Sequence, residues 1–406
     1  MDDIEEPDLA APEARPTIPI LPGRHKRVYA GHPWVYSNEI DMTADLKTLT
    51  PGSIVTLTDA YERPLGTAMF NPRPLISARV LDRNAAAEIN SDWLAARFVD
   101  ASALRDRMFE QPYYRLVHAE ADGLPGLIVD RYGDTCVVQL NTAGMNLLAK
   151  EIVAALQQTL SPSGIVLQRD GSARRMEGLD DVAPDIIGDL PIPARVLENG
   201  VEFLADLSTG QKTGWFFDHR ENRARAASLS AGQRVLDVYS YLGGFGLTAA
   251  AAGASDVLCI DRSGPALEIA ARAAEEAGYA SICRFEKSEA FSALERLSKE
   301  GRRFGIVIAD PPAFVKSRKD LKPGARGYRK LARLSSTLVE PRGILCIASC
   351  SHHMDAASFA EQVQRGMRES GRSGRILHNS GAGPDHPVHP NLPESAYMTC
   401  LFLQLD

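Results

Sequence analysis

The strongest constraint on the fold is an alternation of apolar runs and helical segments that begins near Val196. Apolar runs separated by segments of 3.6-residue periodicity, two of which end at Gly253 and Gly278, indicate strands alternating with helices. Strands in such an order form a parallel sheet that helices cover on both faces. We therefore predict an α/β, Rossmann-like domain. Its five expected strands lie in RVLDVYS, DVLCID, SICRFE, FGIVIAD and GILCIASCS.

The preceding part of the chain follows a different pattern. Between Thr17 and about Val80, short alternating runs such as SIVTLTDA are separated by turns, which indicates a small β-barrel. A helical stretch over 89–109, three short strands and an amphipathic helix over 145–160 then indicate a small α+β unit. We expect a disordered acidic tail at 1–16, the barrel at 17–85, the central α+β domain at 86–190 and the α/β domain at 191–406.

Charge and cysteine usage narrow the class of protein. The net charge of −7 excludes a protein coated with nucleic acid over its whole surface, but it allows a local basic surface. No apolar stretch approaches the roughly 20 residues that span a bilayer, so no membrane association is expected. The six cysteines lack zinc-ribbon or CxxC spacing, which predicts a reduced, cytoplasmic protein without a metal site.

The first candidate site is the turn after the first α/β strand, DVYSYLGGFG at 237–246. A dinucleotide site would need GxGxxG, and Asp237 at the strand end would repel a pyrophosphate. The ammonium group of S-adenosylmethionine would instead be attracted to this carboxylate. Gly243 and Gly244 would let the backbone approach such a cofactor closely. The alternative is that the glycines serve packing alone.

Two further acids follow later strands of the same domain. Asp261 ends the second strand, where an acid commonly accepts hydrogen bonds from ribose hydroxyls. Glu289 follows the third strand and is placed to meet an adenine amino group; the alternative is a solvated acid at a helix N-terminus. Together with Asp237, these acids predict a site for S-adenosylmethionine.

Two more candidate sites end the fourth and fifth strands, at the edge of the sheet where ligands bind. In ADPPAFVKS, Asp310 is held beside two prolines and Phe314, an arrangement that can grip a flat base by hydrogen bonding and stacking. In ASCSHHM, Cys350 stands at a strand end among polar neighbours, as a nucleophilic thiol requires. A plain proline turn, an inert cysteine and a Cys–His metal site are the alternatives.

Two segments concentrate positive charge. Residues 315–333 hold eight basic residues against Asp320 alone, and residues 21–40 mix basic with aromatic side chains. Both compositions suit RNA, through phosphate contact and base stacking. A solvated helix face and a barrel lip with a buried tryptophan are the respective alternatives. The candidate RNA-binding residues are Arg24, Lys26, Arg27, Trp34, Lys316, Arg318, Lys319, Arg326 and Arg329.

Taken together, these motifs resemble the rRNA large subunit methyltransferase I family over nearly the whole chain, from about Ile18 to Leu405. The resemblance implies an N-terminal PUA domain that binds RNA, a central α+β domain and a Rossmann-like class I methyltransferase domain that uses S-adenosylmethionine. The matching segments are RHKRVYAGHPWVYSNEI, AEADGLPGLIVDRYGD, GQKTGWFFDHRENR, DVYSYLGGFGL, DPPAFVKSRKDL, RGYRKL, SCS and DHPV.

The resemblance also implies roles for individual residues. It makes Cys350 the nucleophile. In the reaction expected for such a nucleophile, Asp310 is a catalytic residue, and we expect it also to border the cofactor. Two departures from related sequences matter: His352 and His353 follow SCS, where a glycine is often found, and Ala313 stands where another class of RNA cytosine methyltransferases has a second cysteine. The group that removes the C5 proton is therefore not identified. The cofactor residues that the resemblance adds are Gln211, Thr213, Gly214, Asp218, Arg220 and Tyr239.

We therefore expect the protein to transfer a methyl group from S-adenosylmethionine to carbon 5 of a cytosine in 23S ribosomal RNA, through a bond between Cys350 and C6 of the base. An RNA N-methyltransferase that needs only Asp310 is the nearest alternative enzyme. A non-catalytic RNA-binding assembly factor is the alternative outside enzymes, and the intact Asp237, Asp261, Asp310 and Cys350 speak against it. A homodimer is one of the arrangements that the sequence leaves open.

Overall fold

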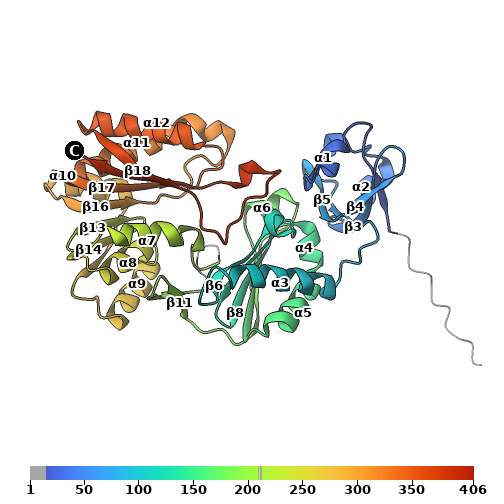
Figure 1. Ribbon diagram of the computed structural model, residues 1–406, viewed down its shortest axis with the longest axis horizontal. Helices are drawn as coiled ribbons and strands as arrows, with labels where there is room; N and C mark the ends of the chain where they lie inside the picture. Colours follow the sequence, from blue (N-terminus) through green and yellow to red (C-terminus); the bar gives the residue numbers. More distant parts are fainter. Residues whose placement is uncertain (1–14, 209, 211–212) are drawn as a thin grey trace, which may run out of the picture.

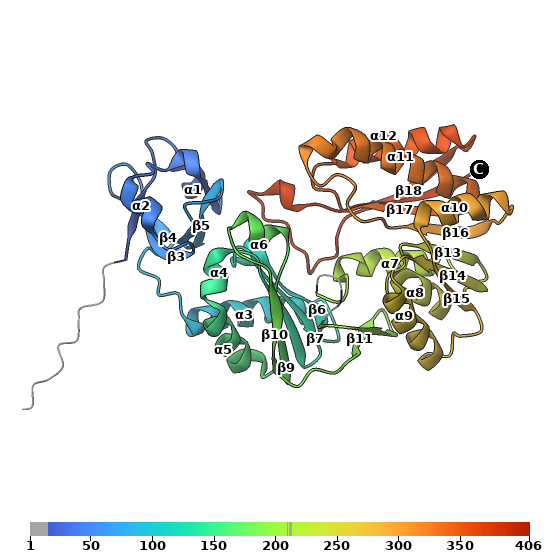
Figure 2. The same ribbon diagram turned by 180° about the vertical axis from the view of Figure 1, so that it is seen from behind.

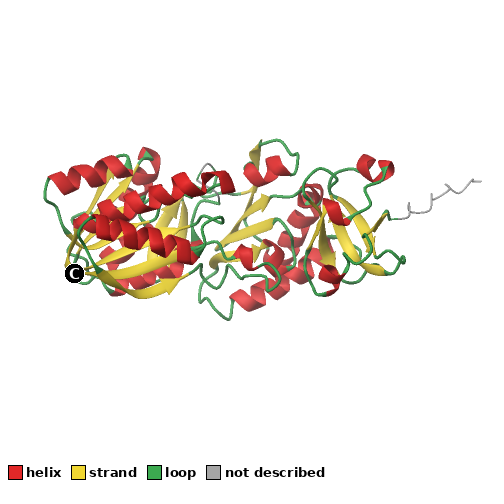
Figure 3. Cartoon of the chain, turned by 90° about the horizontal axis from the view of Figure 1, so that it is seen from above, coloured by secondary structure: helices red, strands yellow, loops and turns green. Residues whose placement is uncertain are grey.

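The structure, a computed structural model, describes residues 15–208, 210 and 213–406. Most of the expected acidic tail, residues 1–14, lies outside the described residues, as does Gln211. Three units, each built on its own sheet, lie in a row along the molecule (Figures 1 and 3). Within the described ranges, no helix combines the length and apolar character needed to cross a membrane.

The N-terminal unit is a five-stranded sheet in the order β1-β3-β4-β5-β2. A bridge between Ile20, just after β1, and Ile40, after β2, joins the two ends of this order, so the sheet closes into a small barrel around a core that includes Val55 and Phe70. The strands are β1 (Thr17–Pro19), β2 (Trp34–Tyr36), β3 (Ser53–Thr58), β4 (Pro64–Phe70) and β5 (Ile76–Asp82), with the short helices α1 (Lys26–Tyr29), η1 (Ser37–Glu39) and α2 (Ala44–Thr48).

The barrel includes two residues before residue 17, where the sequence analysis placed its start. The guanidinium of Arg15 donates to Thr67 Oγ1 at 3.0 Å and to the carbonyl of Ala87 at 2.8 Å. The carbonyl of Pro16 accepts from Thr56 N–H at 2.9 Å. Arg15 and Pro16 therefore belong to the barrel, because their polar groups bond to it.

The central unit is a five-stranded sheet in the order β10-β9-β8-β7-β6, with α3 and α5 packed on it. The amphipathic helix expected over 145–160 is divided at Leu148, whose backbone leaves the helical conformation. Its elements are α3 (Ser91–Arg105), β6 (Tyr113–His118), η2 (Ala119–Asp122), β7 (Leu127–Tyr132), β8 (Thr135–Leu140), α4 (Ala143–Leu147), α5 (Ala149–Leu160), β9 (Gly164–Arg169), α6 (Ser172–Met176) and β10 (Val182–Gly188).

The C-terminal unit begins with a hairpin and two helices: β11 (Ala194–Glu198), β12 (Val201–Ala205), η3 (Phe217–His219) and α7 (Arg220–Ser228). Its seven-stranded sheet has the order β15-β14-β13-β16-β17-β19-β18. The sequence predicted the five parallel strands correctly. The antiparallel pairs β17–β19 and β18–β19 were not predicted.

The helices cover both faces of this sheet, as the doubly wound prediction requires. Side chains of α8 and α9 pack with one set of strand residues, and those of α10, α11 and α12 pack with the alternate set. The elements are β13 (Arg234–Val238), α8 (Gly244–Ala251), β14 (Asp256–Asp261), α9 (Gly264–Glu276), β15 (Cys283–Lys287), α10 (Ala290–Lys299), β16 (Phe304–Ala309), η4 (Arg318–Asp320), α11 (Leu321–Leu338), β17 (Val339–Ser349), α12 (Ala356–Glu369), β18 (Gly374–Ser380), η5 (Pro393–Ser395) and β19 (Thr399–Leu405).

The connection between β18 and β19, residues 381–398, reaches across the molecule to the other two units (Figures 1 and 2). Asn391 Nδ2 donates to the carbonyl of Ala30 in the barrel at 3.2 Å. Asp385 accepts from Arg115 N–H of β6 at 3.0 Å. One segment of the C-terminal unit is thus bonded to both preceding units. We propose 17–85, 86–190 and 191–406 as these three domains, with Arg15 and Pro16 as an extension of the first.

Candidate active site at the carboxyl edge of the seven-stranded sheet

Four predicted site residues end four adjacent strands. Asp261 ends β14, Asp237 lies near the end of β13, Asp310 follows β16 and Cys350 follows β17. These strands are parallel, so their carboxyl ends share one edge. The strand order switches between β13 and β16, because β14 and β15 lie on one side of β13 and β16 and β17 lie on the other. Ligands in open α/β sheets bind at such a switch point.

Asp237 is buried, and only one of its carboxylate oxygens is occupied. Gly246 N–H donates to Oδ2 at 2.9 Å, while Oδ1 has no hydrogen-bond partner among the residues that the structure describes. Burial raises the pKa of the carboxyl to about 7, and the charges of Asp310 and Asp261 add to this. A buried acceptor without a donor costs free energy, and a ligand cation at this point would remove that cost.

Asp261 is held by backbone donors on both sides. Tyr241 N–H donates to Oδ2 at 3.0 Å, and Ser263 N–H donates to Oδ1 at 2.8 Å. Each carboxylate oxygen accepts more than one hydrogen bond, so the pair remains able to bind two ribose hydroxyls. Nearby, Tyr239 adopts a left-handed backbone conformation, and Glu289 is exposed at the N-cap of α10. Burial, followed by the Glu289 charge, raises the pKa of Tyr239.

The glycines of the turn serve different purposes. Gly243 has φ +74°, a conformation that favours glycine. A Cβ at Gly244 would lie 3.1 Å from Arg223 Cδ and 3.2 Å from the Trp215 ring, and one at Gly246 would lie 2.4 Å from Cys259 Sγ. Close packing against α7 and β14 therefore favours glycine at positions 244 and 246, and the role of Gly243 and Gly244 at the cofactor stays a prediction.

Residues just before and at the start of α7 form contacts in two directions: some bond to residues near the sheet edge, and others bond to the central domain. Gly214 accepts at its carbonyl from Tyr241 Oη at 3.3 Å, and Asp218 Oδ2 accepts from Tyr397 Oη at 2.5 Å. Thr213 Oγ1 instead donates to Asp130 Oδ2 at 2.5 Å. Arg220 donates to the carbonyl of Tyr113, and its guanidinium lies 4.5 Å from the Phe109 ring centroid. The contacts of Thr213 and Arg220 therefore hold domains together, and their role at the cofactor stays a prediction.

Asp310 is paired with a histidine that the sequence analysis did not single out. His219 is buried, and its Nε2 lies 3.1 Å from Asp310 Oδ2. Burial lowers the pKa of this imidazole, but the Asp310 carboxylate outweighs burial and raises the pKa to about 9. The amide nitrogen of Asn222, 3.2 Å from Nδ1, suits the neutral ring. In both protonation states Nε2–H donates to Asp310, so one carboxylate oxygen is fixed.

The turn that carries Cys350 is held by the serines on either side of it. Ser349 and Ser351 each hydrogen-bond to the buried Tyr328 hydroxyl, at 2.9 and 2.8 Å, and Val315 N–H donates to Ser351 Oγ at 3.1 Å. The motifs SCS, RGYRKL and DPPAFV therefore meet here. This scaffold leaves Cys350 half-buried with Sγ 3.9 Å from the carbonyl of Pro311. The other five cysteines are buried.

Three residues of the site were missed, and their sequence signals differ. Tyr328 lies in the matching segment RGYRKL, which has a helical pattern. His219 lies in the matching segment GQKTGWFFDHRENR, shortly after its aromatic run. Membership of these segments is the only signal that either residue carries. Tyr397 precedes β19 as a lone aromatic and carries no local signal. Its place beside Asp218 depends on the course of the 381–398 connection.

The basic segments are placed as follows. Lys316, Arg318, Lys319 and Arg326 are exposed and form no ion pair within the described part of the chain, whereas Arg329 bonds to Gln362 Oε1 at 2.8 Å. In the barrel, Arg24 and Lys26 are exposed, and Arg27 pairs with Glu39 at 3.1 Å. Trp34 Nε1 donates to Glu120 of the central domain at 2.7 Å, which favours the alternative of a tryptophan engaged within the protein. RNA binding by all these residues stays a prediction.

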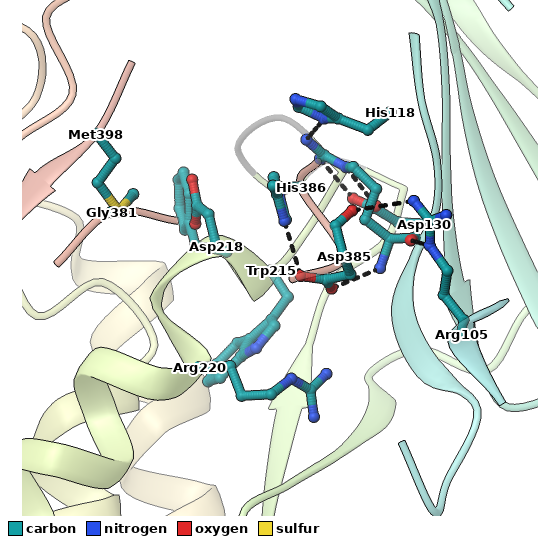
Figure 4. Close-up of polar contacts among 12 residues, drawn as sticks. Arg105, His118, Asp130, Trp215, Asp218, Arg220, Gly381, Asp385, His386 and Met398 are labelled. Atoms are coloured by element: carbon teal, nitrogen blue, oxygen red, sulfur yellow. Dashed lines mark hydrogen bonds and ion pairs between the residues drawn. The ribbon is translucent and has the colours of Figure 1, made fainter. Parts of the chain in front are cut away.

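A buried polar cluster joins the central and C-terminal domains (Figure 4). Asp385 is fully buried, and its carboxylate accepts from Arg115 N–H at 3.0 Å and contacts His386 Nδ1 at 2.9 Å. Its carbonyl accepts from Arg105 at 3.3 Å, and Arg115 forms a two-point ion pair with Asp130 at 2.8 and 2.9 Å. Gly383, two residues before Asp385, donates its N–H to the carbonyl of Asp218 at 3.0 Å, so the segment that carries the cluster is bonded to the candidate site.

Comparisons with known proteins agree with this geometry. A family model for a PUA-like domain matches residues 18–83, and a model for an S-adenosylmethionine-dependent methyltransferase matches residues 175–391. Proteins named ribosomal RNA large subunit methyltransferase I are similar over nearly their full length. The one from Pseudoalteromonas atlantica is 33% identical over 392 residues, 96% of this chain and 99% of the relative. The one from Erwinia tasmaniensis is 32% identical, covering 93% and 96%.

Solved structures show the same architecture. A candidate methyltransferase in complex with SAH has a TM-score of 0.80 at 19% identity, and a candidate SAM-dependent methyltransferase from Streptococcus mutans has 0.79 at 20%. Each covers 96% of this chain and 100% of that chain. The predicted fold and cofactor are therefore confirmed: the C-terminal domain is a class I methyltransferase domain that uses S-adenosylmethionine. The chain belongs to the ribosomal RNA large subunit methyltransferase I family.

Proposed function

We propose that this protein methylates carbon 5 of a cytosine in 23S ribosomal RNA through a covalent bond from Cys350 to C6 of the base. The observation that carries the proposal is the place of Cys350: it is the one cysteine that is not buried, and it ends the strand beside the one that leads into Asp310. The related methyltransferases are named for large-subunit ribosomal RNA, which supports the substrate. The six free thiols fit a reducing cytoplasm, where we place the enzyme.

The chemistry follows from the weak nucleophilicity of cytosine C5. A thiolate from Cys350 adds to C6, and the electron density moves to C5 and to the ring nitrogen N3. The Nε2 proton of His219 passes to Asp310, which donates a hydrogen bond to N3 and so stabilises the activated ring. His219 fixes one carboxylate oxygen of Asp310 and holds a proton on Nε2 toward it. The pair therefore presents a preorganised acid group to the base.

The cofactor residues fit S-adenosylmethionine. Asp237 Oδ1 is a buried acceptor that the ammonium group would occupy, and Asp261 would accept from the ribose hydroxyls. Tyr239 and Glu289 would line the adenine end. When bound, S-adenosylmethionine supplies an electrophilic methyl group. The target base must leave its helix or be unpaired, because C6 is otherwise stacked.

The direct test is the nucleoside content of ribosomal RNA. Deleting the gene should remove one 5-methylcytosine from 23S ribosomal RNA, measured by mass spectrometry of its nucleosides, and the purified protein should restore it in vitro. Loss of an N-methylated base instead would replace this proposal with the N-methyltransferase alternative.

Asp237 predicts a pH-dependent cofactor affinity. Its pKa near 7 means that the carboxylate becomes protonated, and loses its attraction for an ammonium group, as pH falls below 7. We expect the Kd for S-adenosylmethionine to rise up to about tenfold per pH unit below 7, because one proton must be released on binding. Calorimetry between pH 5.5 and 7.5 measures this. Asp237→Asn should bind more weakly with a flat profile; equal slopes for both proteins would contradict the role of Asp237.

Arg326 predicts a salt-dependent RNA contact. It is exposed and forms no ion pair within the described residues, so Arg326→Glu should leave the fold unchanged. We expect weaker RNA binding at every salt concentration and a plot of log affinity against log salt that is flatter by about one unit. Fluorescence anisotropy with 23S ribosomal RNA fragments measures both. The control is Arg303→Glu, an exposed residue at the amino end of β16, which should change neither; identical behaviour of the two variants would remove the contact.

A further inference from the structure

The proposed reaction requires a group that removes the C5 proton, and the inference below rests on that proposed function. Cys350 is bonded to C6 at this stage, and Asp310 is occupied by N3 and His219. A second cysteine does not serve, because the other five are buried and Ala313 stands beside the two prolines. The acceptor must therefore be a different kind of group at the same edge of the sheet.

A closed circuit of contacts and chain neighbours joins the catalytic pair, Cys350 and Asp310, to a tyrosine of the 381–398 connection. Cys350 Sγ lies 3.9 Å from the Pro311 carbonyl, next to Asp310, and Asp310 contacts His219 at 3.1 Å. The circuit continues on the other side of His219. Asp218 precedes it in the chain and accepts from Tyr397 Oη at 2.5 Å, and the Tyr397 ring lies 5.2 Å from that of His352, two residues after Cys350.

The circuit contains two hydrogen-bonded pairs of similar design. In one pair, His219 donates a hydrogen bond to Asp310. In the other, Tyr397 donates a hydrogen bond to Asp218. Burial, then the Asp218 charge, raises the pKa of Tyr397, and the Cys350 charge acts in the same direction. The phenol therefore keeps its own proton in the resting enzyme, and it can accept a second one only while it passes the first to Asp218.

We propose that Tyr397 accepts the C5 proton on Oη while its phenolic proton passes to Asp218. In this step the C5–H bond breaks and its electron pair forms the C5–C6 double bond. The C6–S bond breaks at the same time, and its electron pair returns to Cys350 as thiolate. Asp218 ends the step protonated and then loses that proton to water, which restores the starting charges. Tyr397 is thus a catalytic residue of the release step, and Asp218 is its relay partner.

The test separates methyl transfer from release. Wild type, Tyr397→Phe and Asp218→Asn are incubated with methyl-labelled S-adenosylmethionine and 23S ribosomal RNA from cells that lack the enzyme. In both variants we expect a protein–RNA adduct that survives denaturation and carries the labelled methyl group, because release slows by about 100-fold or more. Wild type should accumulate little adduct. Release of tritium from C5-labelled cytosine should slow by the same factor.

RNA containing 5-fluorocytosine is the matched control, because fluorine cannot leave as a proton does. Wild type and Tyr397→Phe should then be trapped equally, since the blocked step is the one assigned to Tyr397. Wild-type turnover by Tyr397→Phe, weaker trapping by it, or adduct accumulation only in His352→Gln would overturn the assignment. Cofactor binding and melting temperature check folding, and Asp218→Asn tests the relay if Tyr397→Phe is unstable. Failure of the proposed function looks different: no trapping of wild type and an active Cys350→Ala.

Discussion

Cys350→Ala should abolish methyl transfer to ribosomal RNA while leaving cofactor and RNA affinity nearly unchanged. The thiol acts only along the reaction coordinate, so its removal lowers the rate rather than ground-state binding, by about 10⁴-fold or more. The backbone should stay in place, because Ser349 and Ser351 hold the turn through Tyr328. Transfer of labelled methyl groups and calorimetry with S-adenosylmethionine measure the two effects separately.

Cys346→Ala is the matched control for this experiment. Cys346 lies in the same strand but is buried, with its sulfur 3.5 Å from Cys400 Sγ, and burial raises the pKa of its thiol well above 9. It should lose about 1 kcal/mol of stability as a packing change and retain activity. Full activity in Cys350→Ala would end the C5 proposal and favour the N-methyltransferase alternative, in which only Asp310 is needed.

Asp385→Ala should lower the free energy of unfolding by about 3–5 kcal/mol. Its carboxylate is fully buried between His386 and the amide of Arg115, and these contacts, with the Arg220 charge, outweigh burial and lower its pKa. Removing it leaves the buried Arg115 N–H, the His386 ring nitrogen and the Arg220 charge without their partner. Urea unfolding followed by circular dichroism measures the change.

The control for Asp385 is an exposed ion pair in the same domain. Asp256 pairs with Arg284 at 2.6 Å, but the Arg284 side chain is 56% exposed, so Asp256→Ala should cost less than about 1 kcal/mol. A loss at Asp385 no larger than the loss at Asp256 would mean that the cluster does not hold the domains together.

The grouping of the four candidate site residues could be predicted from sequence because parallel strands share a carboxyl edge. Asp237, Asp261, Asp310 and Cys350 each follow an apolar run, so the strand pattern alone brings them together. The pattern also gave the five parallel strands. It did not give β18 and β19, since nothing local tells a strand that returns antiparallel from one that continues the sheet.

The remaining site residues depend on tertiary contacts that no periodicity describes. His219 and Asp218 come from a short helix outside the sheet, and Tyr397 comes from a long connection. Trp34 illustrates the opposite case, in which the sequence suggests a role that a tertiary contact makes less favourable. An aromatic residue among cations suits RNA by composition, yet the indole N–H of Trp34 bonds to Glu120 of another domain. The sequence specifies which side chains are available, and the docking of domains decides which of them are already engaged.

The order of the strands has a consequence for how the enzyme assembles. β19 follows β18 in the chain but lies between β17 and β18, so β18 cannot join the sheet until β19 has inserted. The 381–398 connection runs from one strand to the other, so the same insertion places Asp385 and Tyr397. Insertion of this one strand therefore completes both the junction with the central domain and the side of the candidate site that carries Tyr397.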